Sequence, residues 1–392
     1  MKKICKRFIW IISLMLMILN ISYIYAEDDF DETQESVDSY IDTQLRELDL
    51  DEMQKQLEES IVLEQVDLMS FLKEIIAGEK NILDIFDKDV IKEVLFSELK
   101  NSLKISSIIL ILALLSSLLK SLDNSFSSGT ITKIVNYIVF IMIVSVVLIG
   151  FKDILAICSS TIDTTMNIVS IVLPIMLGLI ALNGLTITST VMTPIFVGAI
   201  SFINLIFKDF VLVTISVAFA VIVINNLSKS IKLKRLSTSI KNINLLAIGS
   251  MLTIYLLVVS MQMLYIKNVD GFALTSAKYA VGNFIPVVGG FLSDSINILI
   301  SSSQLIKSIF GGLGLVILLG VCLIPVIKIV SVIFVYKICS IVVEPIGEEG
   351  ISSFLGEVAN LMTIILACVI AIVFMFFVTI AVLTSMSAVT PG

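Results

Sequence analysis

The chain contains no histidine among its 392 residues. Histidine is the commonest general base and the commonest zinc ligand, and it completes the Ser-His and Cys-His pairs of many hydrolases. Its absence therefore excludes most hydrolase mechanisms and the usual zinc sites. The phosphate-binding pattern GxxxxGK[ST] is missing as well, so the chain cannot drive transport by hydrolysing ATP itself. We expect no catalytic residue, no metal site and no cofactor.

Charged residues are scarce too, at 15% of the chain against 57% hydrophobic residues, with a mean hydropathy of +1.05. An ordinary soluble domain does not reach these values, because its surface must be hydrated. The composition predicts a membrane protein. The five cysteines lack CxxC spacing and stand singly in or beside apolar runs, which predicts buried small side chains. They are Cys5, Cys158, Cys322, Cys339 and Cys368.

Acidic residues are concentrated near the N-terminus. Residues 27–104 hold 23 Asp and Glu against 8 Lys and Arg, whereas residues 105–392 hold 10 against 14. Residues 1–26 combine a basic start, an apolar stretch and a final alanine, the pattern of a secretory signal peptide. Because Ile24 is bulky where a small residue is preferred, an uncleaved signal anchor is the alternative. In both cases we expect residues 27–103 to be an extracytoplasmic segment of amphipathic helices, which either docks another protein or caps the membrane domain.

Residues 104–392 are predicted to form a multispan membrane domain. About 20 apolar residues, each rising 1.5 Å along a helix, cross a hydrocarbon core. The predicted fold is therefore all-α, a polytopic helical membrane protein with about eight transmembrane helices. The predicted spans lie near residues 104–122, 131–151, 167–184, 191–207, 210–227, 243–266, 311–336 and 358–386.

The connection at residues 228–241 is basic and contains no acidic residue, which predicts a cytoplasmic position by the positive-inside rule. This orientation agrees with an exported N-terminal segment. Two pairs of similar segments, at offsets of about 108 residues, also suggest a parallel internal repeat. One pair starts at Ser116 and Ile224, and the other surrounds Pro174 and Pro286.

The stretch "VGNFIPVVGGFLSDS" at residues 281–295 interrupts the apolar pattern. Hydrocarbon cannot bond to free peptide groups, so a broken helix must be packed inside the protein or line water. Two alternatives follow for the region near residues 268–310: a re-entrant or broken helix lining a polar pathway, or an amphipathic hairpin at the outer interface. The candidate pathway residues are Gly282, Asn283, Pro286, Gly289, Gly290 and Asp294, together with Pro174 in the third predicted span.

Two weaker features accompany this break. Lys328, three residues after Pro325, is expected to extend to the nearer interface, with pairing to an intramembrane carboxylate as the alternative. The motif "EPIGEEG" at residues 344–350 gathers three carboxylates and is expected to be a solvated cytoplasmic turn.

Several motifs together resemble the stage III sporulation protein AE family of endospore-forming Firmicutes: "LKEIIAGE", "NILDIF", "KYAVGNFIPVVGGFLSDS" and "EPIGEEGISSFL". The resemblance implies a component of the assembly that the mother cell builds in the membrane around the engulfed forespore. It also implies partners: the other membrane and ring-forming proteins of the stage III sporulation operon, a separate ATPase and, indirectly, a forespore membrane protein. The family has no established catalytic residues, so it supplies no active site.

We therefore expect a non-enzymatic membrane subunit of a secretion-like channel complex that sustains late forespore development, with no nucleic-acid partner. One alternative is a stand-alone secondary transporter or permease with its site between the spans near Pro174 and Pro286. Another is a purely structural membrane anchor of the complex. The sequence does not identify a transported substrate or the number of copies that assemble.

Overall fold

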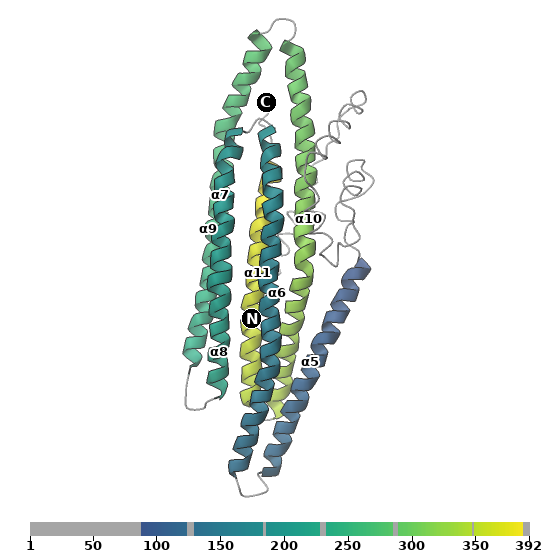
Figure 1. The fold of residues 1–392 in the computed structure, drawn as a ribbon, viewed down its shortest axis with the longest axis vertical. Coiled ribbons are helices and arrows are strands. Elements are labelled where there is room, and N and C mark those ends of the chain that lie inside the picture. The colour runs from purple at the N-terminus through teal and green to yellow at the C-terminus, as the bar shows by residue number, and fades with distance from the viewer. Residues whose placement is uncertain are drawn as a thin grey trace. The chain divides into compact units, whose positions relative to one another are not determined.

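The computed structural model describes residues 88–123, 129–182, 186–227, 233–284, 289–346 and 349–386, and every element within these ranges is a helix (Figure 1). The predicted signal peptide and most of the predicted acidic segment lie outside the described residues, so both stay predictions. In chain order the elements are α5 (Lys88–Asp123), α6 (Gly129–Leu182), α7 (Thr186–Asn204), the π-helix η2 (Leu205–Leu212), α8 (Val213–Leu227), α9 (Lys234–Phe284), α10 (Gly289–Val343), the 3₁₀-helix η3 (Glu344–Ile346) and α11 (Glu349–Ser385).

Six helical stretches of the described chain are long and apolar enough to cross a membrane. The predicted all-α membrane fold is confirmed, but the predicted count of eight spans is not. Predicted spans 131–151 and 167–184 lie in the single helix α6, and 191–207 and 210–227 lie in the continuous run of α7, η2 and α8. The six stretches are Lys92–Leu118, Tyr137–Ala181, Ser189–Leu227, Lys234–Met261, Ile306–Ile346 and Glu349–Ser385.

Polar residues between the predicted spans do not end the helices. Residues 152–166 and the pair Lys208–Asp209 contain neither Gly nor Pro, so the backbone keeps its helical hydrogen bonds through them. The apolar stretch Tyr137–Ala181 is consequently 45 residues long. At 1.5 Å per residue it extends about 67 Å, roughly twice the thickness of a hydrocarbon core. Part of α6 must therefore lie beyond the hydrocarbon core.

The last helix, α11, forms the centre of the bundle. It packs on α10, α6, α9 and α8, and 72% of the residues in an 18-residue apolar window of this helix are buried, against 28–44% in the corresponding windows of the other five stretches. A helix that is apolar on all sides is stable only where other helices surround it or lipid does. The packing of α11 shows that protein covers most of its surface.

Small residues allow α10 to approach its neighbours closely. A Cβ at Gly311 would overlap the side chain of Thr384 in α11, and one at Gly314 would lie 3.2 Å from Val172 in α6. Close backbone approach through small residues is typical of helix contacts in membranes, where van der Waals packing replaces the hydrophobic effect. Cys158, Cys322, Cys339 and Cys368 are buried with free thiols, which confirms the prediction for these four.

The basic stretch 228–241 is only partly a connection. Helix α9 begins at Lys234, so residues 234–241 form its first two turns, and the prediction of a fourteen-residue connection was wrong for this half. Lysine and arginine are good helix formers, and the stretch contains no Gly or Pro to delay the helix. Lys241 donates to the backbone carbonyl of Glu357 at 3.3 Å. The cytoplasmic position of this region stays a prediction.

Lys328 pairs with a carboxylate, Glu98, which lies outside the predicted span 104–122, so extension to an interface and pairing within the membrane both stay predictions. Its Nζ lies 3.4 Å from Oε1 of Glu98, so the lysine joins α10 to α5 by an ion pair. The sequence favoured extension because a lysine within a span usually reaches the nearer interface. Glu98 is 230 positions away, and nothing in the local pattern predicts its contact with Lys328. Glu344 and Glu349 at the turn between α10 and α11 are exposed, as expected for a solvated turn.

The interruption at 281–295 coincides with a helix boundary. Helix α9 ends at Phe284 and α10 begins at Gly289, so the predicted region 268–310 belongs mainly to the ends of two long helices. Pro286 and the side chains of Gly282, Asn283, Gly289, Gly290 and Asp294 lie outside the described part of the chain. Both alternatives for this region, re-entrant and interfacial, therefore stay predictions, as does the internal repeat.

Candidate functional site: a polar groove between α6 and α7

The second half of α6 presents polar and small side chains outward. Between residues 150 and 181 its exposed residues include no large apolar side chain, although this half lies within an apolar stretch. They recur at intervals of three or four residues, so they share one face of the helix. The stripe consists of Ser160, Asp163, Asn167, Ser170, Pro174 and Gly178.

Helix α7 and the π-helix η2 form the opposite wall. Thr193 and Ser201 are exposed on α7, and Lys208 lies in η2, where the wider turn replaces the α-helical one. Single π-helical turns occur often at functional sites. Lys208 is also the midpoint of the apolar stretch Ser189–Leu227, nineteen residues from each end. We use the name polar groove for the stripe on α6 together with Thr193, Ser201 and Lys208.

An ion pair connects the two walls. Nζ of Lys208 donates to both carboxylate oxygens of Asp163, at 2.7 and 2.8 Å. The side chains of Lys208 and Asp163 are 28% and 50% exposed, respectively. Charged groups within apolar helices are expensive in lipid and usually face water, protein or each other. A half-exposed pair of this kind is typical of a surface that faces water or protein.

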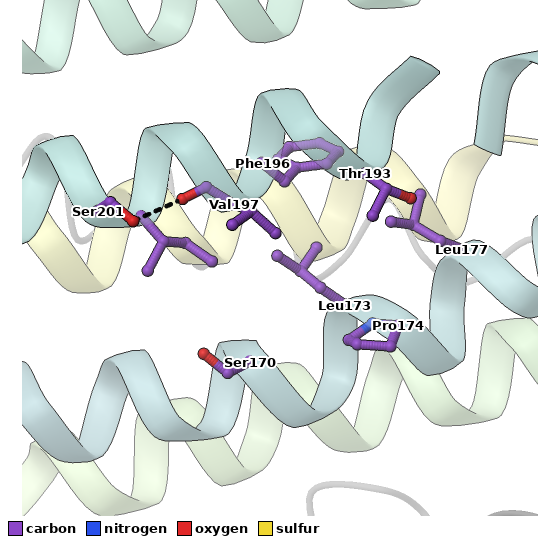
Figure 2. A pocket seen from close by; sticks show the side chains of 9 residues that line it. Ser170, Leu173, Pro174, Leu177, Thr193, Phe196, Val197 and Ser201 are labelled. Carbon is purple, nitrogen blue, oxygen red and sulfur yellow. Dashed lines mark hydrogen bonds between the residues drawn. The ribbon is translucent and has the colours of Figure 1, made fainter. Parts of the chain in front are cut away.

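A cavity of about 230 Å³ lies in the polar groove, two helical turns from the ion pair. Figure 2 shows Leu173 and Pro174 of α6 on one side and Thr193, Phe196 and Val197 of α7 on the other. Beyond the cavity, Oγ of Ser189 donates to the carbonyl of Leu177 at 2.8 Å and holds the two helices together again. The cavity is lined by Ser170, Leu173, Pro174, Leu177, Thr193, Phe196, Val197, Ile200 and Ser201.

The hydroxyl groups of the cavity bond to their own helices. Ser170 donates to the carbonyl of Met166 at 2.8 Å, Thr193 to that of Ser189 at 2.9 Å, and Ser201 to that of Val197 at 3.0 Å. Each hydroxyl proton is thereby committed, and each oxygen keeps acceptor capacity. Across the cavity itself, these hydroxyls do not join α6 to α7.

Pro174 adds one more acceptor. Proline has no N–H, so the carbonyl of Ser170 loses the donor that a residue four positions later normally supplies. Helices in membranes tolerate such a proline when the freed group finds another partner. The turn before Pro174, which borders the cavity, therefore contains a carbonyl without its α-helical donor, next to the Ser170 hydroxyl.

The structure places one predicted pathway residue, Pro174, in this cavity. All nine lining residues belong to α6 and α7, and the predicted residues around Pro286 lie outside the described side chains. Sequence reasoning missed Asp163 and Lys208. Two signals could have found them: the regular spacing of polar residues after Ser160, and a Lys-Asp pair in the middle of an apolar stretch.

Multivalent metal ions do not fit the described chemistry. Within the described ranges, three or more Cys, Asp or Glu side chains do not gather anywhere in a way that could hold such an ion. Asp163 is the single carboxylate of the polar groove, and Lys208 already balances its charge. Calcium and magnesium sites usually need more oxygen ligands and more negative charge.

Comparison with known proteins adds a family. A model of the stage III sporulation protein AE family matches residues 66–387. The chain is also similar to a curated protein named stage III sporulation protein AE from Bacillus subtilis (strain 168), with 27% identity over 267 residues, which is 68% of this chain and 67% of the relative. No solved structure matches the chain.

Proposed function

Because this chain belongs to the stage III sporulation protein AE family, we propose that it is a subunit of the stage III sporulation assembly that connects mother cell and forespore. The chain is a multi-pass membrane protein of sporulation, and its family is not a known enzyme family. On this proposal it works without catalysis, in the mother-cell membrane around the forespore, with its N-terminal segment in the space between the two membranes.

The polar groove carries the functional part of this proposal. A purely structural anchor could present apolar side chains along every membrane helix, since lipid is as apolar as leucine. The second half of α6 exposes polar residues instead, and Lys208 and Asp163 form a half-exposed ion pair. These features support a surface that faces water or another protein, as expected for a subunit that lines a pathway.

The exposed polar residues on the second half of α6 are not explained by placing this whole half of the helix in water. The neighbouring helix α7 exposes large apolar side chains alongside the same stretch, including Ile195, Val197 and Phe202. A bundle section in bulk water would bury such residues or replace them with polar ones. The polar groove is thus a local feature on an otherwise apolar flank.

The partners in this proposal are the other stage III membrane and ring-forming proteins, a separate ATPase and, indirectly, a forespore membrane protein. A separate energy source is needed because the chain lacks a phosphate-binding loop. Purification in mild detergent from sporulating cells should co-isolate several of these proteins. Isolation of the chain alone, with transport activity after reconstitution, would favour the stand-alone transporter instead.

A pair of leucine substitutions tests the groove in sporulating cells. Replacing Asn167 and Ser170 with leucine makes the stripe compatible with lipid and should abolish sporulation while the protein stays in the membrane at its usual level. Ser145→Leu is the matched control, because Ser145 is also exposed on α6 and donates to its own helix, at 2.8 Å from the carbonyl of Ile141.

Two results would contradict the proposal at different levels. Normal sporulation with Asn167→Leu/Ser170→Leu would remove the pathway role and leave an anchor. Normal sporulation after deletion of the gene would remove the sporulation role itself.

A further inference from the structure

We propose that the polar groove binds a small monovalent cation, and that the Lys208 ammonium occupies the same carboxylate, Asp163, when that cation is absent. The proposal names the class of ligand that the polar groove binds, and it rests on the role of the groove in the proposed function.

Oxygen atoms dominate the polar chemistry of the groove. The hydroxyl protons of Ser170, Thr193 and Ser201 point to carbonyls one turn back in their own helices, so their lone pairs remain for a ligand. The carbonyl of Ser170 lacks its helical donor because residue 174 is proline. A site made of acceptors suits a ligand that carries positive charge or donates protons.

The acceptors follow one another along α6. Asp163, Asn167 and Ser170 are exposed on one face at successive turns. Seven residues at 1.5 Å each separate Asp163 from Ser170 by about 10 Å along the axis. A cation can therefore pass from the carboxylate through the amide oxygen of Asn167 to the hydroxyl and freed carbonyl of Ser170. Broken membrane helices in ion-coupled transporters use freed carbonyls in this way.

The charge of the groove limits the ligand to one positive charge. Asp163 carries one negative charge, and Lys208 neutralises it through two hydrogen bonds of 2.7 and 2.8 Å. A monovalent cation at this carboxylate takes over the neutralisation of Asp163 while the displaced Lys208 ammonium turns to solvent, whereas a divalent cation would lack ligands. The nine residues that line the cavity include neither an acidic nor a basic side chain, so the preference for a cation over an anion comes from the Asp163 carboxylate.

Lys208 is built to leave the carboxylate. Its ammonium sits on a flexible four-carbon stem, its side chain is 28% exposed, and it projects from a π-helical turn. Lysine behaves as a compact point charge, so a hydrated or partly hydrated cation competes with it directly. Arginine would hold the carboxylate through a planar, two-point contact and would compete more strongly.

Thermal unfolding of the full chain in lipid nanodiscs tests the proposal. Melting temperature is recorded in rising NaCl, KCl or NH₄Cl, with N-methylglucamine chloride, which supplies a bulky organic cation, keeping total chloride constant. Lys208→Met should show a saturable rise in melting temperature with at least one small cation, at a half-saturating concentration at least tenfold below that of the unsubstituted chain. Lys208→Arg should respond less than the unsubstituted chain.

Three controls locate the effect. Asp163→Asn/Lys208→Met should lose the saturable rise, because the carboxylate that binds the cation is gone. Asp209→Asn removes a neighbouring exposed charge in η2 and should leave the response unchanged. Ser170→Ala in the Lys208→Met background should raise the half-saturating concentration, whereas Ser216→Ala should not. Ser216 is the match because it is exposed and donates to its own helix at 2.9 Å.

An equal response of Lys208→Met to small cations and to N-methylglucamine would overturn the proposal, and so would an undiminished response after Asp163→Asn. If Lys208→Met does not fold, the Lys208→Arg variant decides: a response to small cations equal to or larger than that of the unsubstituted chain would also overturn the proposal. The assay uses purified protein, so loss of cation binding and loss of the sporulation role are separate results.

Discussion

The two halves of α6 expose different surfaces although one continuous helix contains both. From residue 134 to 149 the exposed large side chains are apolar, among them Ile138, Ile141 and Ile149. From residue 152 to 178 every exposed residue is charged, polar, small or proline. Both halves bury apolar side chains on the opposite face, including Ile143 and Val172.

The difference between the two halves distinguishes residues that serve folding in the membrane from residues that serve function. The buried face of each half follows from packing against α10 and α11, and apolar residues satisfy it everywhere. Where the exposed face lies in hydrocarbon, lipid would accept apolar residues on it. Packing does not require the polar residues on one half, and we assign them to the polar groove.

Introduced lysines should give the largest contrast between the halves. Ile141→Lys places a charge on the apolar face and should destabilise the membrane-inserted protein by about 2.5–3.5 kcal/mol if that face is near the bilayer centre. Asn167→Lys, one turn from Asp163, should be tolerated. The measurement is the amount of folded protein in the membrane and its resistance to unfolding by detergent; equal losses for both variants would contradict the comparison.

Loss of the ion pair should have the next largest effect. Asp163→Leu leaves Lys208 without its partner and should lower the free energy of unfolding by about 1–3 kcal/mol, between the values for exposed and buried pairs. Asp163→Leu/Lys208→Leu should recover part of the loss, because no unpaired charge remains. Denaturant titration in detergent micelles measures both. If the double variant is less stable than Asp163→Leu, the pair is not the source of the effect.

Pro174→Ala should change the groove more than the stability. Alanine restores the N–H that bonds to the carbonyl of Ser170, and in a membrane helix the net change should be within about 1 kcal/mol. Hydrogen exchange should show a protected amide at position 174 and slower exchange in the turn before it. Unchanged exchange in that turn would mean that the carbonyl already has another partner.

Two serine substitutions should give the smallest effect on stability. Ser170→Ala and Ser145→Ala each remove an exposed hydroxyl that bonds to its own helix, so each should change the free energy of unfolding by no more than about 0.5 kcal/mol. The two variants should differ in sporulation, with a defect for Ser170→Ala alone. Equal sporulation would show that this hydroxyl is not used.

Composition was sufficient to predict the all-α membrane fold, since hydrocarbon leaves few alternatives to helices. The number of spans was less predictable, because Lys152 and Lys208 interrupt the hydropathy but not the backbone. Pro174 could be named from the sequence because a missing N–H is visible there; it lines the cavity, and its role in a pathway stays a prediction. The pairing of Lys208 with Asp163 could not be predicted, since it depends on the packing of η2 against α6.

The most direct test of the account is photo-crosslinking in sporulating cells with a diazirine-bearing amino acid at position 145 or 170 of α6. The carbene inserts into lipid, water or protein, and mass spectrometry distinguishes the products. We predict phospholipid adducts at position 145, and water or protein adducts at position 170. Phospholipid adducts at position 170, in a yield equal to that at position 145, would contradict the claim that the polar half of α6 is shielded from lipid.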